Sequence, residues 1–339
     1  MTEPILIWGA GAIGGILGAY LARAGHAVHM VDIVEDHVRA MRGDGLRVEG
    51  PVEAFAQVLP ASTPVELEGQ FGRVILAVKA HHTGAALDML VPHLAPGGYV
   101  VSAQNGLNEV EIARVAGAAR TVGCFVNFGA DYLSPGVVHY SGRGAVVVGE
   151  LDGADTPRLR ALHELMLRFD DRAVRTDNIW GYLWGKMTYG ALLFGTALTD
   201  DSIVDVLDGK DCRAVLIALG QETGAVAAAE GVVPVGFNGF DPAAFAPGAP
   251  PAALDRTFDA MVAHNRTSAK THSGIWRDLA VRKRKTECEA QLGPIVTTGR
   301  KAGVATPLTL RLMEMIAQIE RGERPLARGN LAELAEVAA

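Results

Sequence analysis

Three glycines near the start of the chain, Gly9, Gly11 and Gly14, are spaced G-x-G-x-x-G. Gly9 permits a tight turn, and Gly11 leaves room for backbone amides to approach a pyrophosphate, because no Cβ stands in the way. Gly14 lets the following helix pack closely against the preceding strand. Ala12 and Ile13 open that helix, where N–H groups at the helix end and the helix dipole attract phosphate. This spacing predicts a site for the phosphates of a dinucleotide.

The residues around these glycines favour the same interpretation. Residues 5–8 form an apolar run typical of a strand, and residues 16–24 are apolar and small with helical spacing. A second apolar strand over residues 27–31 ends at Asp32, eighteen positions after Gly14, where a carboxylate binds the adenosine ribose. The alternative is an ordinary strand–helix–strand turn with a surface aspartate, and the full context favours dinucleotide binding.

Two polar residues follow later strands of the chain. Lys79 ends the strand expected over residues 73–78, and Asn105 follows the strand expected over residues 98–102. Ligands of open α/β sheets bind at the carboxyl ends of parallel strands. Both residues are therefore candidates for ligand binding.

The second half of the chain contributes two more candidates, Lys186 and Glu287. Lys186 is the only cation between Arg175 and Lys210, within a strongly apolar stretch. A lysine there either extends along the helix edge to water or faces a polar site, and the residues alone leave both interpretations open. Glu287 follows a basic run at residues 282–285, and such a run is typical of a solvated helix face.

The elements that must position these residues alternate in the first half of the chain. Apolar strands alternate with helix-like stretches, which predicts a doubly wound, mostly parallel sheet. The further strands are expected over residues 73–78, 98–102 and 120–126, and the helices over residues 83–94 and 109–115. Residues 137–140 and 145–149, joined by residues 141–144, are expected as a hairpin or as adjoining antiparallel strands that close the sheet.

Strand patterns largely end near residue 178, and long apolar stretches of helical length follow. Helices are expected over residues 179–198, 212–230, 254–265, 287–302 and 308–321. Residues 232–251, rich in proline and glycine, are expected as a loop, and the tail from residue 324 as surface chain. We therefore predict an α/β fold, with an N-terminal Rossmann-type doubly wound sheet in residues 1–177. An all-α domain for substrate binding and dimerisation is predicted in residues 178–339, with a ligand cleft between the two domains.

The composition argues against several classes of protein. Of the 339 residues, 49% are hydrophobic and 20% are charged, so the chain can bury the cores of two domains. The net charge of −7 argues against nucleic-acid binding, and no apolar run is long enough to predict a membrane span. Cys124, Cys212 and Cys288 are too far apart for a metal motif. The N-terminus has no pattern of a secretion signal, so a reduced cytoplasmic location is expected.

Several short motifs give the chain a resemblance to a known family. They are the glycine turn, Val78-Lys79-Ala80, Gln104-Asn105-Gly106-Leu107, Pro135-Gly136 with His139, Trp184-Gly185-Lys186, Thr286-Glu287 and Gly303-Val304-Ala305-Thr306-Pro307. In this order and spacing, from near residue 5 to near residue 320, they resemble the ketopantoate reductases of the 6-phosphogluconate-dehydrogenase-like superfamily. One such motif would be weak evidence, whereas the whole series in order is specific.

The resemblance implies an NAD(P)-dependent dehydrogenase or reductase (EC 1.1.1.-) that interconverts a 2-oxo acid and a 2-hydroxy acid. The cofactor handles the hydride, while the protein positions and polarises the carbonyl. Lys186 is implied as the general acid, and partial burial lowers the pKa of a lysine toward a useful range. Glu287 is implied to hold a substrate hydroxyl or to orient Lys186. Asn105 is implied to contact substrate or the nicotinamide, Lys79 the adenosine end, and Ser273, after a short alignment gap, the substrate.

One departure from the family concerns the cofactor. Ketopantoate reductases usually carry an arginine just after the second strand, facing the 2′-phosphate of NADP. Here the strand ends at Asp32, which can accept hydrogen bonds from ribose hydroxyls and would repel a 2′-phosphate. NAD(H) is therefore expected over NADP(H), although Lys79, Arg39 or Arg42 could still tolerate the phosphate.

A second departure concerns the substrate. The family commonly has asparagines one and two turns after the lysine, and here those positions are Gly190 and Phe194. A site that hydrogen-bonds a substrate hydroxyl discriminates strongly, so loss of these amides puts ketopantoate in doubt. The pocket is expected to be roomier at Gly190 and more apolar at Phe194. His272 and Arg277 are further substrate candidates, Arg277 as a bidentate partner of a carboxylate, and the alternative for most of this stretch is a solvated helix face.

Three hypotheses follow from these observations. The leading one is an NAD-dependent oxidoreductase for a small 2-oxo or 2-hydroxy acid other than ketopantoate. The first alternative is an authentic 2-dehydropantoate 2-reductase. The second is a non-catalytic NAD-binding sensor, against which the presence of both Lys186 and Glu287 argues. A homodimer is expected, with a small acidic substrate and without a metal, nucleic-acid or membrane partner.

Overall fold

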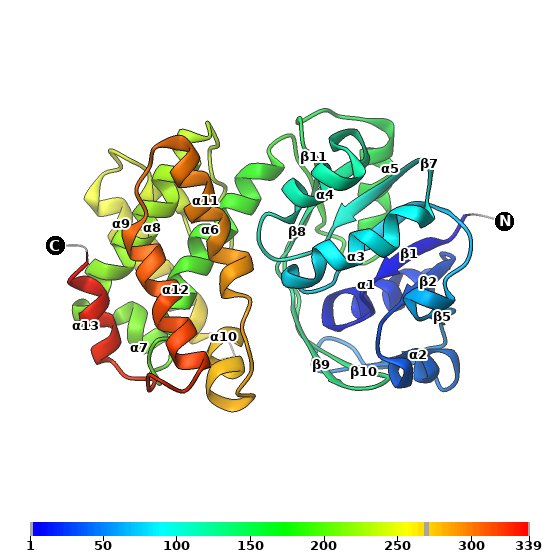
Figure 1. Ribbon diagram of the computed structural model, residues 1–339, viewed down its shortest axis with the longest axis horizontal. Coiled ribbons are helices and arrows are strands. Elements are labelled where there is room, and N and C mark those ends of the chain that lie inside the picture. Colours follow the sequence, from blue (N-terminus) through cyan, green and yellow to red (C-terminus); the bar gives the residue numbers. More distant parts are fainter. Residues whose placement is uncertain (1–2, 268–270, 338–339) are drawn as a thin grey trace. The chain divides into compact units, whose positions relative to one another are not determined.

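The structure of the chain is a computed structural model that describes residues 3–267 and 271–337 (Figure 1). The chain divides into two compact units, Met1–Ile179 and Trp180–Ala339. The division falls at the start of a helix because the side chain of Ile179 packs against Gly123 and Gly149 of the first unit. Each unit is described by itself below.

In the described residues of the first unit, eight strands form one sheet in the order β12-β11-β8-β7-β6-β1-β2-β5. The strands are β1 (Ile5–Trp8), β2 (Val28–Val31), β5 (Ala61–Ser62), β6 (Phe71–Leu76), β7 (Leu94–Ser102), β8 (Thr121–Val126), β11 (Val146–Glu150) and β12 (Val174–Arg175). From β5 to β8 every neighbouring pair is parallel. Taken in chain order, these six strands have the 3-2-1-4-5-6 arrangement of a Rossmann sheet. The predicted fold class of this unit is confirmed.

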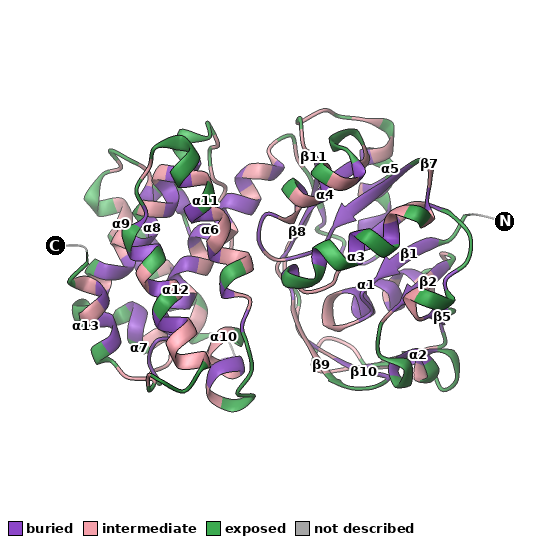
Figure 2. Cartoon of the chain, in the orientation of Figure 1, coloured by how far each residue is buried: buried purple, intermediate pink, exposed green. Residues whose placement is uncertain are grey.

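Helices cover both faces of this sheet. They are α1 (Ala12–Arg23), α2 (Glu35–Arg42), α3 (Thr83–Leu90), α4 (Asn108–Ala116) and α5 (Pro157–Met166), with short 3₁₀ turns at Pro64–Glu66, Ala80–His82, Val91–His93 and Ala118–Arg120. Alternate residues of β1 belong to two different hydrophobic cores, one on each face of the sheet. Ile5 and Ile7 pack with α1 and α5. Leu6 and Trp8 pack with α3 and α4. The central strands are accordingly buried, as Figure 2 shows.

A second, four-stranded sheet corrects one prediction. It has the order β4-β3-β10-β9, formed by β3 (Leu46–Glu49), β4 (Phe55–Gln57), β9 (Gly129–Ser134) and β10 (Val137–Gly142). The expected hairpin of residues 137–149 is therefore wrong, since β10 pairs with β9 and β3 while β11 pairs antiparallel with β8. Between them the chain passes close beside Asn127, whose N–H donates to the carbonyl of Ala145 at 2.9 Å. After this crossing, β11 joins the large sheet. The part of the prediction that placed an antiparallel strand in that sheet is confirmed.

The second unit is helical, as predicted. Its helices are α6 (Ile179–Thr196), α7 (Ile203–Asp208), α8 (Lys210–Ala229), α9 (Pro251–Arg266), α10 (Gly274–Trp276), α11 (Cys288–Ala302), α12 (Pro307–Glu320) and α13 (Gly329–Ala335), with a 3₁₀ turn at Pro242–Phe245 and a π turn at Arg277–Val281. The expected surface tail is wrong, because Leu331 and Leu334 of α13 are buried and Arg324 pairs with Glu333 at 2.7 Å. Among the described residues, none of the helices has both the length and the apolar character needed to cross a membrane.

Candidate functional site

The glycine turn lies between β1 and α1, and its geometry explains each glycine. Gly9 has φ +96°, and a Cβ there would lie 2.7 Å from the backbone nitrogen of Val78. A Cβ at Gly14 would collide with the carbonyl oxygen of Gly9, so the helix can approach the turn only without one. Gly11 differs, because a Cβ there would meet no atom within 4 Å. Two of the glycines therefore allow close packing, and the third borders open space.

The amino end of α1 is suited to an anion. Gly11 is the N-cap, and among the described side chains none caps this end and none in the first turn is acidic. The first N–H groups of the helix, including those of Ala12 and Ile13, therefore have no capping side chain, and they carry the positive end of the helix dipole. A pyrophosphate fits the open space beside Gly11 and these donors, so the residues present fit a dinucleotide.

The residues after β2 are those expected from the sequence at the adenosine end of this site. Asp32 is half-buried, and its Oδ1 accepts a hydrogen bond from the N–H of Val34 at 3.0 Å. Burial, together with the charges of Asp32 and Asp36, raises the pKa of the Tyr132 phenol, so both carboxylates act on the same region.

Two of the three cations considered for a 2′-phosphate already have carboxylate partners. Arg39 pairs with Asp36 at 2.7 Å. Arg42 pairs with Glu66 at 3.0 Å and donates to the carbonyl of Ala61 at 2.5 Å. A 2′-phosphate would have to compete with these carboxylates for either arginine.

Lys79 and Asn105 follow the neighbouring strands β6 and β7, and both are half-buried. A polar network that the sequence analysis missed supports the loop of Asn105. Gln104 donates to Thr83 at 2.8 Å, Thr83 donates to Asn108 at 2.9 Å, and Asn108 donates to the Asn105 carbonyl at 2.6 Å. Within the described ranges, the side-chain amide of Asn105 itself makes no hydrogen bond. The loop is therefore held by hydrogen bonds, and the Asn105 amide is available to a ligand.

In the second unit, Gly190 of α6 lies close to Gln291 of α11. Lys186 is half-buried on α6, and Gly190 lies one turn later on the same helix face. A Cβ at Gly190 would meet nothing closer than the Oε1 of Gln291, at 3.8 Å. Gln291 lies on α11, one turn after Glu287, which is the N-cap of that helix and accepts the Gln291 N–H at 2.9 Å. One added Cβ at Gly190 would therefore be accommodated, in ordinary contact with Gln291, and a wider pocket there stays a prediction.

Phe194 requires a correction. It was expected to line the pocket, yet its side chain is 0% exposed and is among the largest fully buried side chains of the chain. A ring with no exposed surface makes no contact with a ligand unless its neighbours move. Along this face α6 therefore passes from a half-buried lysine into the core of the helical unit, and Phe194 belongs to the core.

The remaining substrate candidates lie after residue 270, and two of them contact neighbouring residues. The Ser273 hydroxyl caps α10 by accepting the Trp276 N–H at 3.1 Å. The His272 ring stacks on Trp276 with centroids 4.0 Å apart, and Trp276 donates to Asp200 at 3.0 Å. Arg277 is half-buried at the start of the π turn. Ser273 and His272 thus have structural roles that account for their positions.

The basic run at residues 282–285 does not form the expected helix face. Arg282 and Arg284 instead pair with Asp278, at 3.0 and 2.9 Å. No cluster of three or more histidine, cysteine, aspartate or glutamate side chains that could hold a metal ion occurs in the part of the chain that the structure describes.

Comparison with known families matches nearly the whole chain. The family described as "Ketopantoate reductase PanE/ApbA" matches residues 5–153, and its C-terminal counterpart matches residues 178–320. The chain belongs to the ketopantoate reductase family. The resemblance noted in the sequence is confirmed, and the protein is an NAD(P)-dependent oxidoreductase of this family.

Individual ketopantoate reductases support the assignment. A 2-dehydropantoate 2-reductase of Mesorhizobium japonicum is 31% identical over 261 residues, which are 69% of this chain and 79% of that protein. One from Pyrococcus abyssi is 27% identical and covers 92% of this chain and 96% of its own. A solved ketopantoate reductase of Ralstonia eutropha is 27% identical with a TM-score of 0.77, covering 94% of this chain and 99% of its own.

A D-mandelate dehydrogenase shares the fold. The structure of a D-mandelate dehydrogenase with NADH and anilino(oxo)acetate has a TM-score of 0.81 and covers 94% of this chain and 99% of its own. Its sequence is 22% identical, so this likeness concerns the fold alone.

Proposed function

We propose that this protein transfers hydride between NAD(H) and a small 2-oxo or 2-hydroxy acid other than ketopantoate. The observation that carries the proposal is the space at Gly190, one helical turn from Lys186, where nothing lies closer to an added Cβ than Gln291 at 3.8 Å. A side chain is missing at this position and an added Cβ would meet only Gln291, so the proposal is that a substrate group larger than the family's usual one occupies this place. The absence of an amide side chain at this position also removes a partner for a substrate hydroxyl.

The bound nicotinamide would supply or accept the hydride. In the reducing direction, Lys186 would give a proton to the carbonyl oxygen as negative charge develops on it. Glu287 would hold a substrate hydroxyl or orient the Lys186 ammonium. The side-chain amide of Asn105 would bind the substrate or the nicotinamide. Arg277 stays a candidate for the substrate carboxylate.

The preference for NAD(H) rests on the region after β2. Asp32 and Asp36 place negative charge there, while Arg39 and Arg42 are paired with carboxylates. A free ribose hydroxyl can donate to Asp32, whereas a 2′-phosphate would be repelled. The D-mandelate dehydrogenase with this fold was solved with NADH and a 2-oxo acid derivative, which makes bulky 2-oxo acids the first substrates to test.

Filling the space at Gly190 should change the substrate profile. In Gly190→Asn we expect kcat/KM for a 2-oxo acid with a bulky apolar group to fall about tenfold, since the new side chain occupies its volume. Ketopantoate reduction should rise, because an amide becomes available to its hydroxyl. Steady-state kinetics on both substrates measures the change, and Gly190→Ala is the control with little added volume. An unchanged ratio of the two kcat/KM values would contradict the proposed pocket.

The alternative function is authentic 2-dehydropantoate 2-reductase, favoured by the names of the relatives. Rescue of a pantothenate auxotroph separates the two, because only the alternative predicts growth. Homodimerisation and a cytoplasmic location stay predictions.

A further inference from the structure

His37 on α2 is fully buried and joins two segments that are distant in sequence. Its Nε2 lies 2.8 Å from the carbonyl oxygen of Ala10, within the glycine turn. Its Nδ1 accepts the N–H of Gly136 at 2.8 Å, in the turn between β9 and β10. One imidazole therefore connects the glycine turn to the second sheet.

The two partners define the protonation of the ring. A backbone N–H can only donate, so Nδ1 must be the accepting nitrogen. A backbone carbonyl can only accept, so Nε2 must carry the hydrogen. His37 is therefore held as the neutral Nε2–H tautomer, with both ring nitrogens satisfied.

The bond to Ala10 controls the direction of a neighbouring donor. In a planar trans peptide the C=O and the N–H point in opposite directions. When the Ala10 carbonyl is turned inward to His37, the Gly11 N–H of the same peptide unit must point away from it. Gly11 borders open space, as the absence of any atom within 4 Å of an added Cβ demonstrates. We propose that His37 is a positioning residue that holds this peptide with the Gly11 N–H aimed at the cofactor pyrophosphate.

The turn at Gly136, which donates a hydrogen bond to His37, is itself held by further contacts. Gly136 has φ +77°, a Cβ there would lie 2.7 Å from the Cβ of Ala40, and its carbonyl accepts the Arg47 N–H at 2.8 Å. The turn that receives His37 is thus packed on α2 and bonded to β3.

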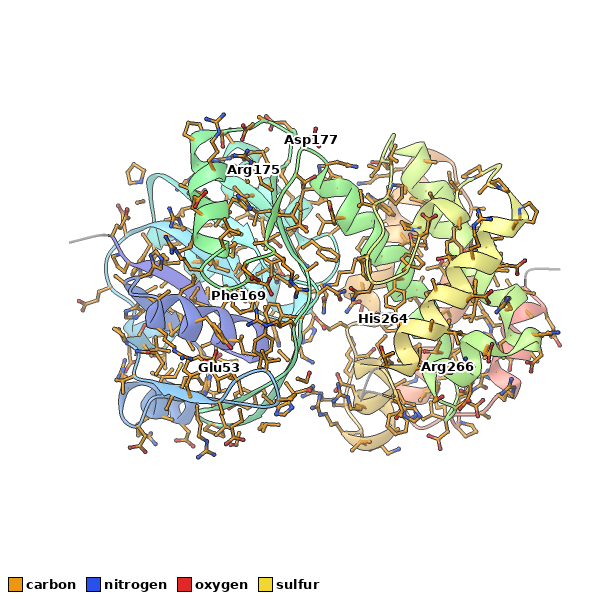
Figure 3. All side chains as sticks on the ribbon, turned by 180° about the vertical axis from the view of Figure 1, so that it is seen from behind. Glu53, Phe169, Arg175, Asp177, His264 and Arg266 are labelled. Carbon is orange, nitrogen blue, oxygen red and sulfur yellow. The ribbon has the colours of Figure 1, made fainter. Side chains whose placement is uncertain are left out.

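The second sheet is in turn attached to α1 through Tyr20. Its ring packs edge-on against Phe55 at 5.1 Å and Phe169 at 5.3 Å, and its hydroxyl donates to Glu53 at 3.0 Å. Figure 3 labels Glu53 and Phe169 in the first unit. The anchor of His37 therefore belongs to the same packed body as the helix that follows the glycine turn.

The competing interpretation is a core histidine that contributes only to stability. Two near-isosteric replacements distinguish it from the proposal. The amide nitrogen of His37→Gln can reach the place of Nε2 and donate to Ala10, whereas the amide oxygen of His37→Asn can take the place of Nδ1 and accept from Gly136. Each variant keeps one hydrogen bond and loses the other, so both should lower the thermal midpoint of the protein without ligand.

The experiment measures the Kd of NADH and of ADP-ribose by calorimetry, together with thermal unfolding of the ligand-free protein. We expect His37→Gln to bind both ligands within about twofold of wild type and His37→Asn to bind both about tenfold more weakly. Gly11→Ala, which places a methyl group in the open space, is the positive control for lost pyrophosphate binding. Leu162→Ala, a buried change in α5, is the control for lost stability with unchanged affinity.

The positioning role would be refuted if both His37 variants bound NADH and ADP-ribose equally weakly. Unchanged affinity in His37→Asn would refute it as well. If His37→Asn does not fold, His37→Gln still tests the proposal, since lost affinity in that variant overturns it. The inference rests on the proposed function only in that a dinucleotide binds at the glycine turn. Because both ligands are titrated without substrate, an error in the assigned substrate leaves this result unaffected.

Discussion

Replacing Lys186 by alanine should reduce kcat about 10³-fold while leaving the Kd of NADH within about twofold of wild type. A positioned general acid contributes about 10² to 10⁴ to a rate, and alanine removes the only proton donor assigned to the developing alkoxide. The cofactor contacts proposed for the glycine turn and Asp32 belong to the other unit of the chain and remain intact. Stopped-flow or steady-state NADH oxidation gives kcat, and calorimetry gives Kd.

Two further variants test whether the loss of kcat comes from the lost proton donor. The alternatives are the lost positive charge and a nonspecific effect of replacing a lysine. Lys186→Arg keeps the positive charge but cannot release a proton at ordinary pH, so it should stay as inactive as the alanine variant. Lys210→Ala changes an exposed lysine at the start of α8 and should leave both kcat and Kd unchanged. Wild-type turnover in Lys186→Ala would overturn the assignment of Lys186.

Wild-type enzyme should use NADH with a kcat/KM about 100-fold above that for NADPH. Like charges brought together without compensation cost several kcal/mol, and about 2.7 kcal/mol corresponds to this ratio. The repulsion comes from Asp32, and Arg42 cannot offset it while it pairs with Glu66 at 3.0 Å. Parallel kinetics with the two cofactors at one substrate concentration measures the ratio.

The double variant Asp32→Ser with Glu66→Gln tests the cause of this preference. It removes the repelling carboxylate and frees Arg42, while glutamine can still accept the Thr63 N–H that Glu66 now accepts at 2.9 Å. We expect NADPH use to rise about tenfold and NADH use to fall, because the ribose loses its carboxylate partner. Arg114→Ala, which removes an exposed arginine of α4 that pairs with Glu111 at 2.6 Å, is the matched control. A wild-type preference for NADPH would contradict this part of the account.

The first unit was predictable where the signal is local. The strand over residues 5–8, the glycine turn and the helix after it lie within about twenty residues, and each constrains its neighbour. The second sheet was missed because its strands are short and pair across long distances, as β3 does with β10 about ninety residues later. Residues 141–144 looked like a hairpin loop, yet the chain crosses between two sheets there.

In the site, too, contacts between residues near in sequence were predictable and contacts between distant residues were not. The i,i+3 pair of Asp36 and Arg39 is visible in the sequence, whereas the pair of Arg42 and Glu66 depends on the placement of a distant turn. His37 gave no signal, because both of its partners are backbone groups, 27 and 99 residues away. Phe194 lies on the predicted helix face, but periodicity alone cannot tell where that face enters the core.

The most direct test of the proposed function is a panel of 2-oxo acids that includes ketopantoate, assayed by the loss of NADH absorbance and repeated with NADPH. The account predicts that an acid with a larger apolar group has the highest kcat/KM, about 100-fold above ketopantoate, and that NADH is the better cofactor. The highest kcat/KM for ketopantoate with NADPH would contradict both the wider pocket proposed at Gly190 and the repulsion assigned to Asp32.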